Sequence, residues 1–332
     1  MIKVAINGFG RIGRAAAKII MLSDDLELTA VNDLSDAKTL LFLLSHDSVY
    51  GSFGKEIRYS DDDQITIDGK KIHFFSEKEP SKLPWEALGI DVVLESTGVF
   101  LTKDDCQDHI RAGARKVVMS APAKDDVTPT YLMGVNADDY GGESIISNAS
   151  CTTNCIAPVM KVLDDQFGVK YSLMTTVHSY TADQNLVDGP HKDLRRARCA
   201  ALNIVPTTTG AAKTVTKIIK GLEGNFDGLA IRVPSQIVSL SDIVAVTERP
   251  ASADQINKVL IEASESYMNG IIAIADGPVV SSDLIQNEAS AIVDTELTNV
   301  IGGHLIKVIA WYDNEWGYSK RLVEMAKLIA EK

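Results

Sequence analysis

The chain has 332 residues, of which 45% are hydrophobic, and a formal net charge of −12. This length is sufficient for two domains with cores of their own. No run of 18 apolar residues occurs, so we expect no membrane-spanning helix, and the negative charge argues against nucleic acid as the main partner. The first residues form a strand pattern without the basic and long apolar regions of a signal peptide, so we expect a cytoplasmic protein.

The first half of the chain alternates strand patterns with helical ones. We predict strands at residues 2–6, 27–31, 91–95 and 116–119, helices at 11–21, 40–44 and 103–112, and a hairpin within 57–75. The Asp68-Gly69 pair marks the turn of that hairpin. This rhythm predicts an α/β fold with a parallel, doubly wound sheet of the Rossmann type.

The glycine-rich turn after the first predicted strand fits the dinucleotide fingerprint, Gly-Phe-Gly-Arg-Ile-Gly at residues 8–13. Asp33 follows Gly13 by 20 residues, the distance expected of a carboxylate that binds a ribose diol. Its charge would repel the 2′-phosphate of NADP, so we favour NAD. The alternative is a glycine turn that only packs a helix against the sheet. The residues assigned to the cofactor here are Asn7, Gly8, Gly10, Arg11, Ile12, Gly13 and Asp33.

After residue 151 the pattern changes to long β-rich runs. Strands are predicted at residues 171–178, 226–233, 237–247, 289–294 and 305–312, and helices at 210–220, 253–268 and 315–331. This pattern indicates an α+β domain with a mainly antiparallel sheet. Residues 179–200 form a long irregular stretch, and loops of this length are usually functional or lie at interfaces.

Cys151 is the candidate nucleophile. Ser150 is a natural helix cap, so Cys151 would be the first residue of a helix. A helix N-terminus favours an anion and lowers the pKa of a thiol. The alternative is that Cys151 is a small buried residue. Among the six histidines, His178 ends an apolar strand and begins the long loop, but sequence spacing alone does not bring it to Cys151.

The other cysteines are Cys106, Cys155 and Cys199. A long chain without secretory features argues against a disulfide framework, and the lack of a second Cys or His pair argues against a zinc site. We therefore expect free thiols and no bound metal. Cys155, one helical turn after Cys151, is either a packed small residue or a redox partner for oxidised Cys151.

The sequence Ser-Asn-Ala-Ser-Cys-Thr-Thr-Asn-Cys at residues 147–155 resembles the active-site signature of the phosphorylating glyceraldehyde-3-phosphate dehydrogenases. Further stretches are similar to motifs of that family, in its order, at residues 7–14, 178–181, 195–198, 208–213, 232–234 and 311–318. The resemblance implies an NAD-binding Rossmann domain over residues 1–149, completed by a C-terminal helix at 315–332, and a catalytic domain over residues 150–314. It also implies a homotetramer in which the long loop lies at a subunit contact.

The same resemblance implies a reaction. Cys151 attacks the aldehyde of glyceraldehyde 3-phosphate, His178 is the base, hydride passes to NAD, and inorganic phosphate releases the thioester as an acyl phosphate. The substrate phosphate is assigned to Thr181, Arg196 and Arg232, and the attacking phosphate to Ser150, Thr152, Thr209 and Gly210. The resemblance further assigns the cofactor to Lys78, Thr97, Gly98, Ser120 and Asn314.

Two other functions stay open. Erythrose-4-phosphate dehydrogenase is a sister enzyme with the same fold and nucleophile, but the sequences around Thr181 and Thr209 are more similar to the glyceraldehyde-3-phosphate type. A dinucleotide-binding protein without catalysis is disfavoured, because the nucleophile, the base and the phosphate-site residues are all present.

Overall fold

The computed structural model describes residues 1–60 and 64–332, which form two compact units. One unit comprises Met1–Ala149 with Ser319–Lys332, and the other comprises Ser150–Tyr318. Residues 61–63, within the stretch predicted to hold the hairpin, lie outside the described part. Among the described residues, no helix combines the length and the apolar character that crossing a membrane requires.

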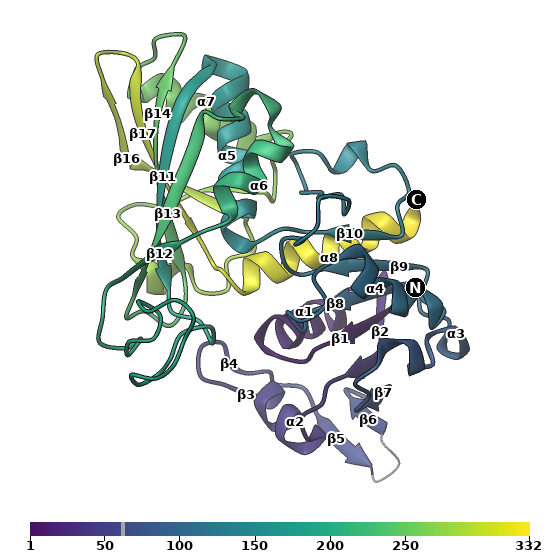
Figure 1. Cartoon of the computed structure of the whole chain (residues 1–332). Coiled ribbons are helices and arrows are strands. Elements are labelled where there is room, and N and C mark those ends of the chain that lie inside the picture. Colours follow the sequence, from purple (N-terminus) through teal and green to yellow (C-terminus); the bar gives the residue numbers. More distant parts are fainter. Residues whose placement is uncertain (61–63) are drawn as a thin grey trace. The chain divides into compact units, whose positions relative to one another are not determined.

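The first unit is built on an eight-stranded sheet in the order β10-β9-β8-β1-β2-β7-β6-β5 (Figure 1). The strands from β10 to β7 pair in parallel, and β6 and β5 add an antiparallel edge. The strands are β1 (Ile2–Asn7), β2 (Leu26–Asn32), β5 (Ile57–Ser60), β6 (Gln64–Ile67), β7 (Lys70–Phe75), β8 (Val92–Glu95), β9 (Lys116–Met119) and β10 (Ile145–Ser147), with a separate pair, β3 (His46–Asp47) and β4 (Gly51–Ser52). The predicted parallel sheet with its hairpin is confirmed.

Helices connect and cover these strands. They are α1 (Arg11–Met21), α2 (Ala37–Ser45), α3 (Trp85–Leu88), α4 (Lys103–Arg111) and α8 (Trp316–Glu331), with short 3-10 turns at Pro80–Lys82 and Ala137–Asp139. α1 packs on β1 and β2, and α4 packs on β9 and β10. The strand order reverses between β1 and β8, and in doubly wound sheets ligands bind beyond the carboxyl ends of the strands at such a reversal.

The second unit holds a seven-stranded sheet in the order β12-β13-β11-β14-β17-β16-β15 (Figure 1). The pairs β11–β13 and β15–β16 are parallel and the other four are antiparallel, which confirms a mainly antiparallel sheet. The strands are β11 (Val169–Ser179), β12 (Val205–Thr208), β13 (Phe226–Val233), β14 (Ser239–Thr247), β15 (Ile272–Ile274), β16 (Ala291–Ile301) and β17 (Leu305–Tyr312). The helices α5 (Cys151–Phe167), α6 (Ala211–Ile218) and α7 (Ala253–Glu265) pack on it, with 3-10 turns at Lys220–Leu222 and Ser281–Leu284.

Several predicted boundaries differ from the structure. The strand expected from residue 237 begins at Ser239, because Val238 has φ +64°, which a strand does not accommodate. β10, β12 and β15 have three or four residues each and were not predicted. Such short runs carry little periodicity, so their strand state depends on pairing with neighbouring strands.

Candidate active site

Two glycines in the turn after β1 leave no room for a side chain. A Cβ at Gly8 would lie 2.6 Å from the Thr97 nitrogen, and one at Gly13 would lie 2.1 Å from the Gly8 carbonyl oxygen. Gly8 also has φ +92°, a conformation that favours glycine. α1 begins at Arg11 directly after the turn, with Gly10 as its N-cap. A tight turn leading into a helix N-terminus suits a dinucleotide pyrophosphate, so these residues fit NAD.

Asp33 follows the end of β2 and lies against this turn. Its Oδ2 accepts a hydrogen bond from the Phe9 N–H at 2.7 Å, and its Oδ1 accepts one from the Ser35 N–H at 2.8 Å. The structure therefore brings the predicted ribose-binding carboxylate together with the glycine turn.

The loop that carries Lys78 is held at the same edge of the sheet by the side-chain amide of Asn32, here called the amide clamp. The Asn32 amide donates to the Glu77 carbonyl at 2.9 Å and accepts from the Glu77 N–H at 2.8 Å. The same Asn32 nitrogen donates to the Asn7 side-chain oxygen at 2.7 Å. The clamp ties the loop that carries the exposed Lys78 to the end of β2.

Thr97, Gly98 and Ser120 lie at the carboxyl edge of the sheet, as predicted. Thr97 and Gly98 follow β8, and Ser120 follows β9, with its N–H donating to the Glu95 carbonyl at 2.9 Å. Since β8 and β9 pair in parallel next to β1, these residues share one edge with the glycine turn.

Two residues assigned to the cofactor use their side chains for other contacts. Asn7 is 1% exposed, and its amide donates to Glu95 at 2.6 Å, so its side chain joins strand ends. The Arg11 guanidinium lies 3.3 Å from the Asp47 carboxylate. Ile12, next in α1, is half-buried.

The second unit brings Cys151 and His178 together. Cys151 is the first residue of α5, and the Ser150 hydroxyl caps this helix by accepting from the Thr153 N–H at 3.1 Å. His178 lies near the end of β11, and its Nε2 is 3.6 Å from Cys151 Sγ. This distance allows the imidazole to take the thiol proton.

Hydrogen bonds assign the tautomer of His178. Its Nδ1 lies 2.7 Å from the Ser179 carbonyl oxygen, which only accepts, and 3.1 Å from Arg232 Nη1, which only donates. The shorter contact, to the carbonyl, places the proton on Nδ1. Arg232 Nη1 donates to the same carbonyl at 3.0 Å. The Nε2 lone pair then faces Cys151, so His178 is arranged as a base.

Two opposing effects act on the pKa of the half-buried Cys151 thiol. Burial raises the pKa of Cys151 and outweighs the opposing effects of Arg232, the Thr152 hydroxyl and the helix-start amides. Burial, together with the Arg232 charge, lowers the pKa of His178 to about 3. These shifts favour a thiol beside a neutral imidazole.

Arg232 and Thr181 converge beside the imidazole. β11 and β13 pair in parallel with His178 opposite Arg232, which places the guanidinium next to the imidazole. Arg232 Nη1 lies 3.4 Å from Thr181 Oγ1. Guanidinium and hydroxyl groups are suitable donors for a phosphate, so the chemistry of these two residues fits their predicted role, which stays a prediction.

Arg196 is occupied by protein partners. Its guanidinium forms an ion pair with Asp183, donates to the Thr207 hydroxyl at 2.9 Å and lies 3.5 Å from the Asp193 carboxylate. Binding of a substrate phosphate by Arg196 therefore requires the exchange or sharing of these partners.

The residues assigned to the attacking phosphate lie at the N-termini of two helices. Ser150 and Thr152 are at the start of α5, and Thr209 and Gly210 precede α6. The two helices pack against each other, and helix N-termini attract anions. The Thr152 hydroxyl, however, lies 2.9 Å from Tyr312 Oη, so it also holds the protein together.

Sequence reasoning did not identify Tyr312 as a site residue. Its hydroxyl bonds Thr152 at 2.9 Å and Thr176 at 2.8 Å, and its ring lies edge-on to His178 with centroids 6.0 Å apart. Burial raises the pKa of Tyr312, so its hydroxyl stays neutral. Its place in the motif at residues 311–318 was a signal, but only the fold brings β17 beside α5 and places β14 alone between β17 and β11.

Asn314 is held by two serines that sequence reasoning also missed. The hydroxyls of Ser179 and Ser239 each donate to Asn314 Oδ1 at 3.0 Å. With its oxygen engaged, Asn314 has its NH₂ group to offer to a ligand.

Replacing Tyr312 by phenylalanine tests whether its hydroxyl stabilises the site. We expect the free energy of unfolding to fall by about 1–3 kcal/mol, because two buried threonine hydroxyls lose their partner. Urea unfolding measures this change. Tyr267→Phe is the control, because Tyr267 is 57% exposed and should lose little. Equal stability of the two variants would contradict the assignment.

Cys155 is packed in the interior of the second unit. It is fully buried, with Sγ 3.8 Å from the Ala310 carbonyl oxygen, and burial raises its pKa. These contacts favour the interpretation of Cys155 as a packed small residue. All four cysteines are free, and the described residues contain no group of three or more His, Cys, Asp or Glu side chains suited to hold a metal.

Comparison with known proteins matches both units. Residues 2–103 match the NAD binding domain of glyceraldehyde 3-phosphate dehydrogenase, and residues 150–314 match the C-terminal domain of that enzyme. Glyceraldehyde-3-phosphate dehydrogenase 2 of Nostoc sp. is 50% identical over 100% of this chain and 99% of its own length. The chloroplastic glyceraldehyde-3-phosphate dehydrogenase B of Pisum sativum is 50% identical over 100% of this chain and 74% of its own length. The enzyme of Mycobacterium avium is 49% identical over 99% of each chain. The chain therefore belongs to the glyceraldehyde-3-phosphate dehydrogenase family.

Proposed function

We propose that this chain catalyses the NAD-dependent oxidation and phosphorylation of D-glyceraldehyde 3-phosphate to 1,3-bisphosphoglycerate, with Cys151 as nucleophile and His178 as base. The supporting observation is the 3.6 Å contact between Cys151 Sγ and the unprotonated Nε2 of His178. Thr181 and Arg232 beside this pair provide donors for a phosphorylated substrate.

In this proposal His178 carries out the proton transfers, and Cys151 carries the acyl group. Cys151 transfers its proton to His178 and attacks the aldehyde carbon, and the imidazolium returns this proton to the carbonyl oxygen, which gives a thiohemiacetal and a neutral His178. His178 then removes the hydroxyl proton of this adduct. When bound, NAD supplies the hydride acceptor for its oxidation to a thioester. Inorganic phosphate attacks the thioester carbon, releases an acyl phosphate and restores Cys151, while the helix-start amides stabilise the oxyanion.

The two parts of the chain have separate tasks in this proposal. The NAD-binding domain is residues 1–149, completed by the C-terminal helix, and the catalytic domain is residues 150–314. The glycine turn with Asp33 supports the first assignment, and the Cys151–His178 pair supports the second. A cytoplasmic location is supported by the four free cysteines, which are typical of a reducing compartment.

The deciding assay follows NADH formation from NAD, glyceraldehyde 3-phosphate and inorganic phosphate. Turnover that requires phosphate would support the proposal. Turnover with erythrose 4-phosphate in place of glyceraldehyde 3-phosphate would favour the sister enzyme, and no turnover with either aldehyde would favour a binding protein.

Replacing Asp33 by serine tests the choice of cofactor. The carboxylate lies beside the glycine turn, so it would bind the ribose diol of NAD and repel the 2′-phosphate of NADP. We expect the ratio of kcat/KM for NAD over NADP to fall at least about tenfold, which corresponds to about 1.4 kcal/mol. The reason is that serine carries no charge to repel the 2′-phosphate of NADP. Equal ratios in the two proteins would refute the role of Asp33.

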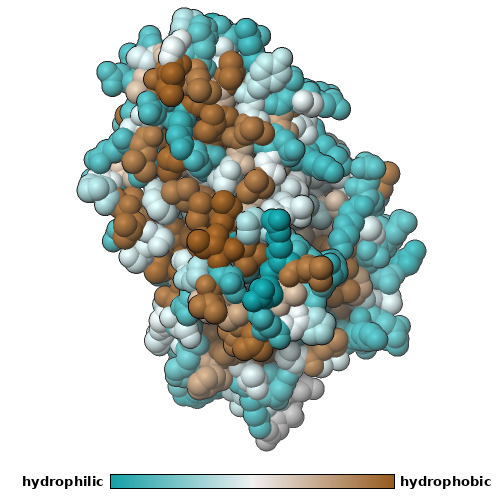
Figure 2. All heavy atoms as spheres, turned by 60° about the vertical axis from the view of Figure 1, so that its left-hand side comes forward, coloured by the Kyte–Doolittle hydropathy of each residue, from teal (hydrophilic) through white to brown (hydrophobic). Residues whose placement is uncertain are grey.

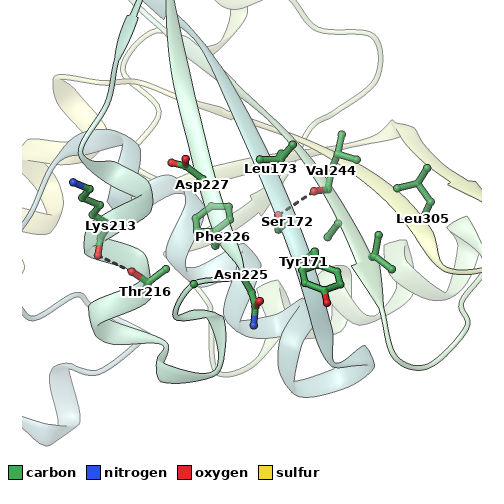
Figure 3. A pocket seen from close by; sticks show the side chains of 13 residues that line it. Tyr171, Ser172, Leu173, Lys213, Thr216, Asn225, Phe226, Asp227, Val244 and Leu305 are labelled. Atoms are coloured by element: carbon green, nitrogen blue, oxygen red, sulfur yellow. Dashed lines mark hydrogen bonds between the residues drawn. The ribbon is translucent and has the colours of Figure 1, made fainter.

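We further propose that the chain is a homotetramer that uses the apolar side of the second sheet. Tyr171 is 63% and Leu173 67% exposed, and Figure 2 shows hydrophobic residues gathered on this side of the second unit. The strand register aligns Leu173 with Val244, and Val246 with Leu305. A cavity of about 620 Å³ lies there, and Figure 3 shows Tyr171, Leu173, Val244 and Leu305 around it. Exposed apolar patches of this kind mark protein interfaces.

Replacing Leu173 by glutamate tests this interface. A charge at its apolar centre should shift the sedimentation coefficient from that of four chains to that of a smaller species, because the charge would lose water on assembly. Leu22→Glu is the matched control, since Leu22 is 65% exposed at the end of α1 in the other unit. A wild-type monomer, or a tetramer in Leu173→Glu, would contradict the proposal.

A further inference from the structure

A buried carboxylate lies beneath the glycine turn and has no role in the reaction described above. Glu95 ends β8 and is 2% exposed. Its Oε2 accepts from the Asn7 amide at 2.6 Å and from His109 Nε2 at 3.1 Å. Its Oε1 accepts from the Thr97 N–H at 2.8 Å and from the Thr97 hydroxyl. Four donors thus surround one carboxylate, which only accepts.

A fifth residue, Trp85, determines which nitrogen of His109 carries a proton. Trp85, in α3, donates its indole N–H to His109 Nδ1 at 3.0 Å. An indole N–H only donates, so His109 Nδ1 carries no proton and Nε2 donates to Glu95. Both rings are fully buried. His109 is therefore a neutral donor that orients Glu95, rather than its ionic partner.

Glu95 connects this cluster to the backbone that contacts the glycine turn. A Cβ at Gly8 would meet the Thr97 nitrogen at 2.6 Å, so the turn and the Thr97 peptide touch. The Thr97 hydroxyl, held by Glu95, accepts from the Val99 N–H at 3.1 Å, which shapes the turn at residues 97–99. Asn7 binds the other carboxylate oxygen and directly precedes Gly8. Glu95 thus holds the chain on both sides of the contact.

We propose that Glu95 is a positioning residue for NAD. It holds the turn at residues 97–99 against the glycine turn before the cofactor binds. The cost of ordering these two loops therefore does not reduce the free energy of NAD binding. Glu95 acts through Asn7 and Thr97 and need not touch NAD. This inference rests on the proposed location of the cofactor at the glycine turn.

Glu95→Gln in the full-length chain tests the proposal by calorimetric titration with NAD. In either orientation the glutamine NH₂ would face an N–H donor, from Asn7 and His109 or from the Thr97 backbone, so at least one hydrogen bond must be lost. We expect the Kd for NAD to rise about tenfold, the effect of one lost hydrogen bond to a charged group. The KM for NAD should rise in parallel, and kcat at saturating NAD should stay within about twofold, because the loops become ordered once NAD is bound.

Two further variants separate positioning from general destabilisation. Ile90→Ala removes volume from the same core, where Ile90 is fully buried, and should lower the melting temperature more than Glu95→Gln does, while Trp85 and all four donors to Glu95 remain. Its Kd for NAD should therefore stay near the wild-type value. Tyr140→Phe removes a hydroxyl that bonds Lys116, at the amino end of β9, and should also leave the Kd unchanged.

The outcomes distinguish this inference from the location of the cofactor. A Kd that follows melting temperature across these variants, or a Glu95→Gln protein with wild-type Kd, would overturn the inference. If Asp33→Ala also binds NAD with wild-type Kd, the cofactor location is wrong as well. If Asp33→Ala weakens binding and Glu95→Gln does not, only the positioning role fails. Should Glu95→Gln not fold, His109→Phe removes one donor and is expected to raise the Kd by a smaller factor.

Discussion

Replacing Cys151 by serine is expected to abolish phosphate-dependent NADH formation, with kcat reduced by roughly 10⁴-fold or more, the order found when an enzyme loses its nucleophile. Burial already raises the pKa of the Cys151 thiol, so the site depends on proton transfer to His178 over 3.6 Å. A serine hydroxyl is much less acidic than a thiol and would not yield its proton to an imidazole of low basicity. The measurement is the steady-state rate at saturating substrates.

The control for this prediction is the cysteine one helical turn away. Cys155→Ala should keep most of the activity and lose stability, because Cys155 is fully buried against Ala310 and is not paired with His178. If Cys151→Ser kept more than a tenth of the activity, or if Cys155→Ala were equally inactive, Cys151 would not be the nucleophile.

Replacing His178 by asparagine is expected to lower kcat by about 10²- to 10⁴-fold, the usual contribution of a positioned base. The pH dependence should change as well. In the wild type the pKa of His178 is lowered to about 3, so the imidazole is an unprotonated base at all pH values above that. Because the pKa of Cys151 is raised, the fraction of enzyme molecules with a Cys151 thiol and a neutral His178 barely changes between pH 5 and 8. We expect a nearly flat rate in this range.

The variant should behave differently because it lacks the base. Its rate depends on the fraction of thiolate, which grows tenfold per pH unit below the raised pKa of Cys151. The deficit of His178→Asn should therefore be largest at pH 5 and shrink toward pH 8 and above. His304→Asn is the control, since His304 bonds the Thr247 carbonyl at the other end of the sheet. A constant deficit across pH would contradict the role of His178 as base.

The raised pKa of Cys151 has a consequence for the resting enzyme. The thiol stays protonated at neutral pH, so it should react slowly with alkylating reagents until substrate or cofactor changes its surroundings. Arg232 opposes the effect of burial on Cys151 and at the same time lowers the pKa of His178. One cation therefore favours the deprotonated form of both groups of the pair.

The sequence alone determined the fold class and much of the chemistry. Short apolar runs and a helical pattern placed β1, α1 and β2, because buried strands and amphipathic helices carry their burial pattern in the sequence. The glycine fingerprint and the acidic residue after the second strand identified the cofactor edge, since only glycine fits where the backbone of residues 8, 13 and 97 meets. Ser150 predicted the helix that begins at Cys151, because helix caps are local.

Only the tertiary structure decided which groups meet and how they are charged. His178 lies 27 residues after Cys151 and Tyr312 lies 160 after Thr152, and both contacts follow from the pairing of distant strands. The pKa of Cys151 moved against the expectation from its helix start, because burial is a property of the packed unit and not of the local sequence. The ion pairs of Arg196 with Asp183 and Asp193 also follow from how the loop folds, and the sequence did not indicate them. The local sequence determines which side chains each helix or strand end carries. Long-range packing determines the neighbours of each side chain and its exposure to water, and these two determine its protonation.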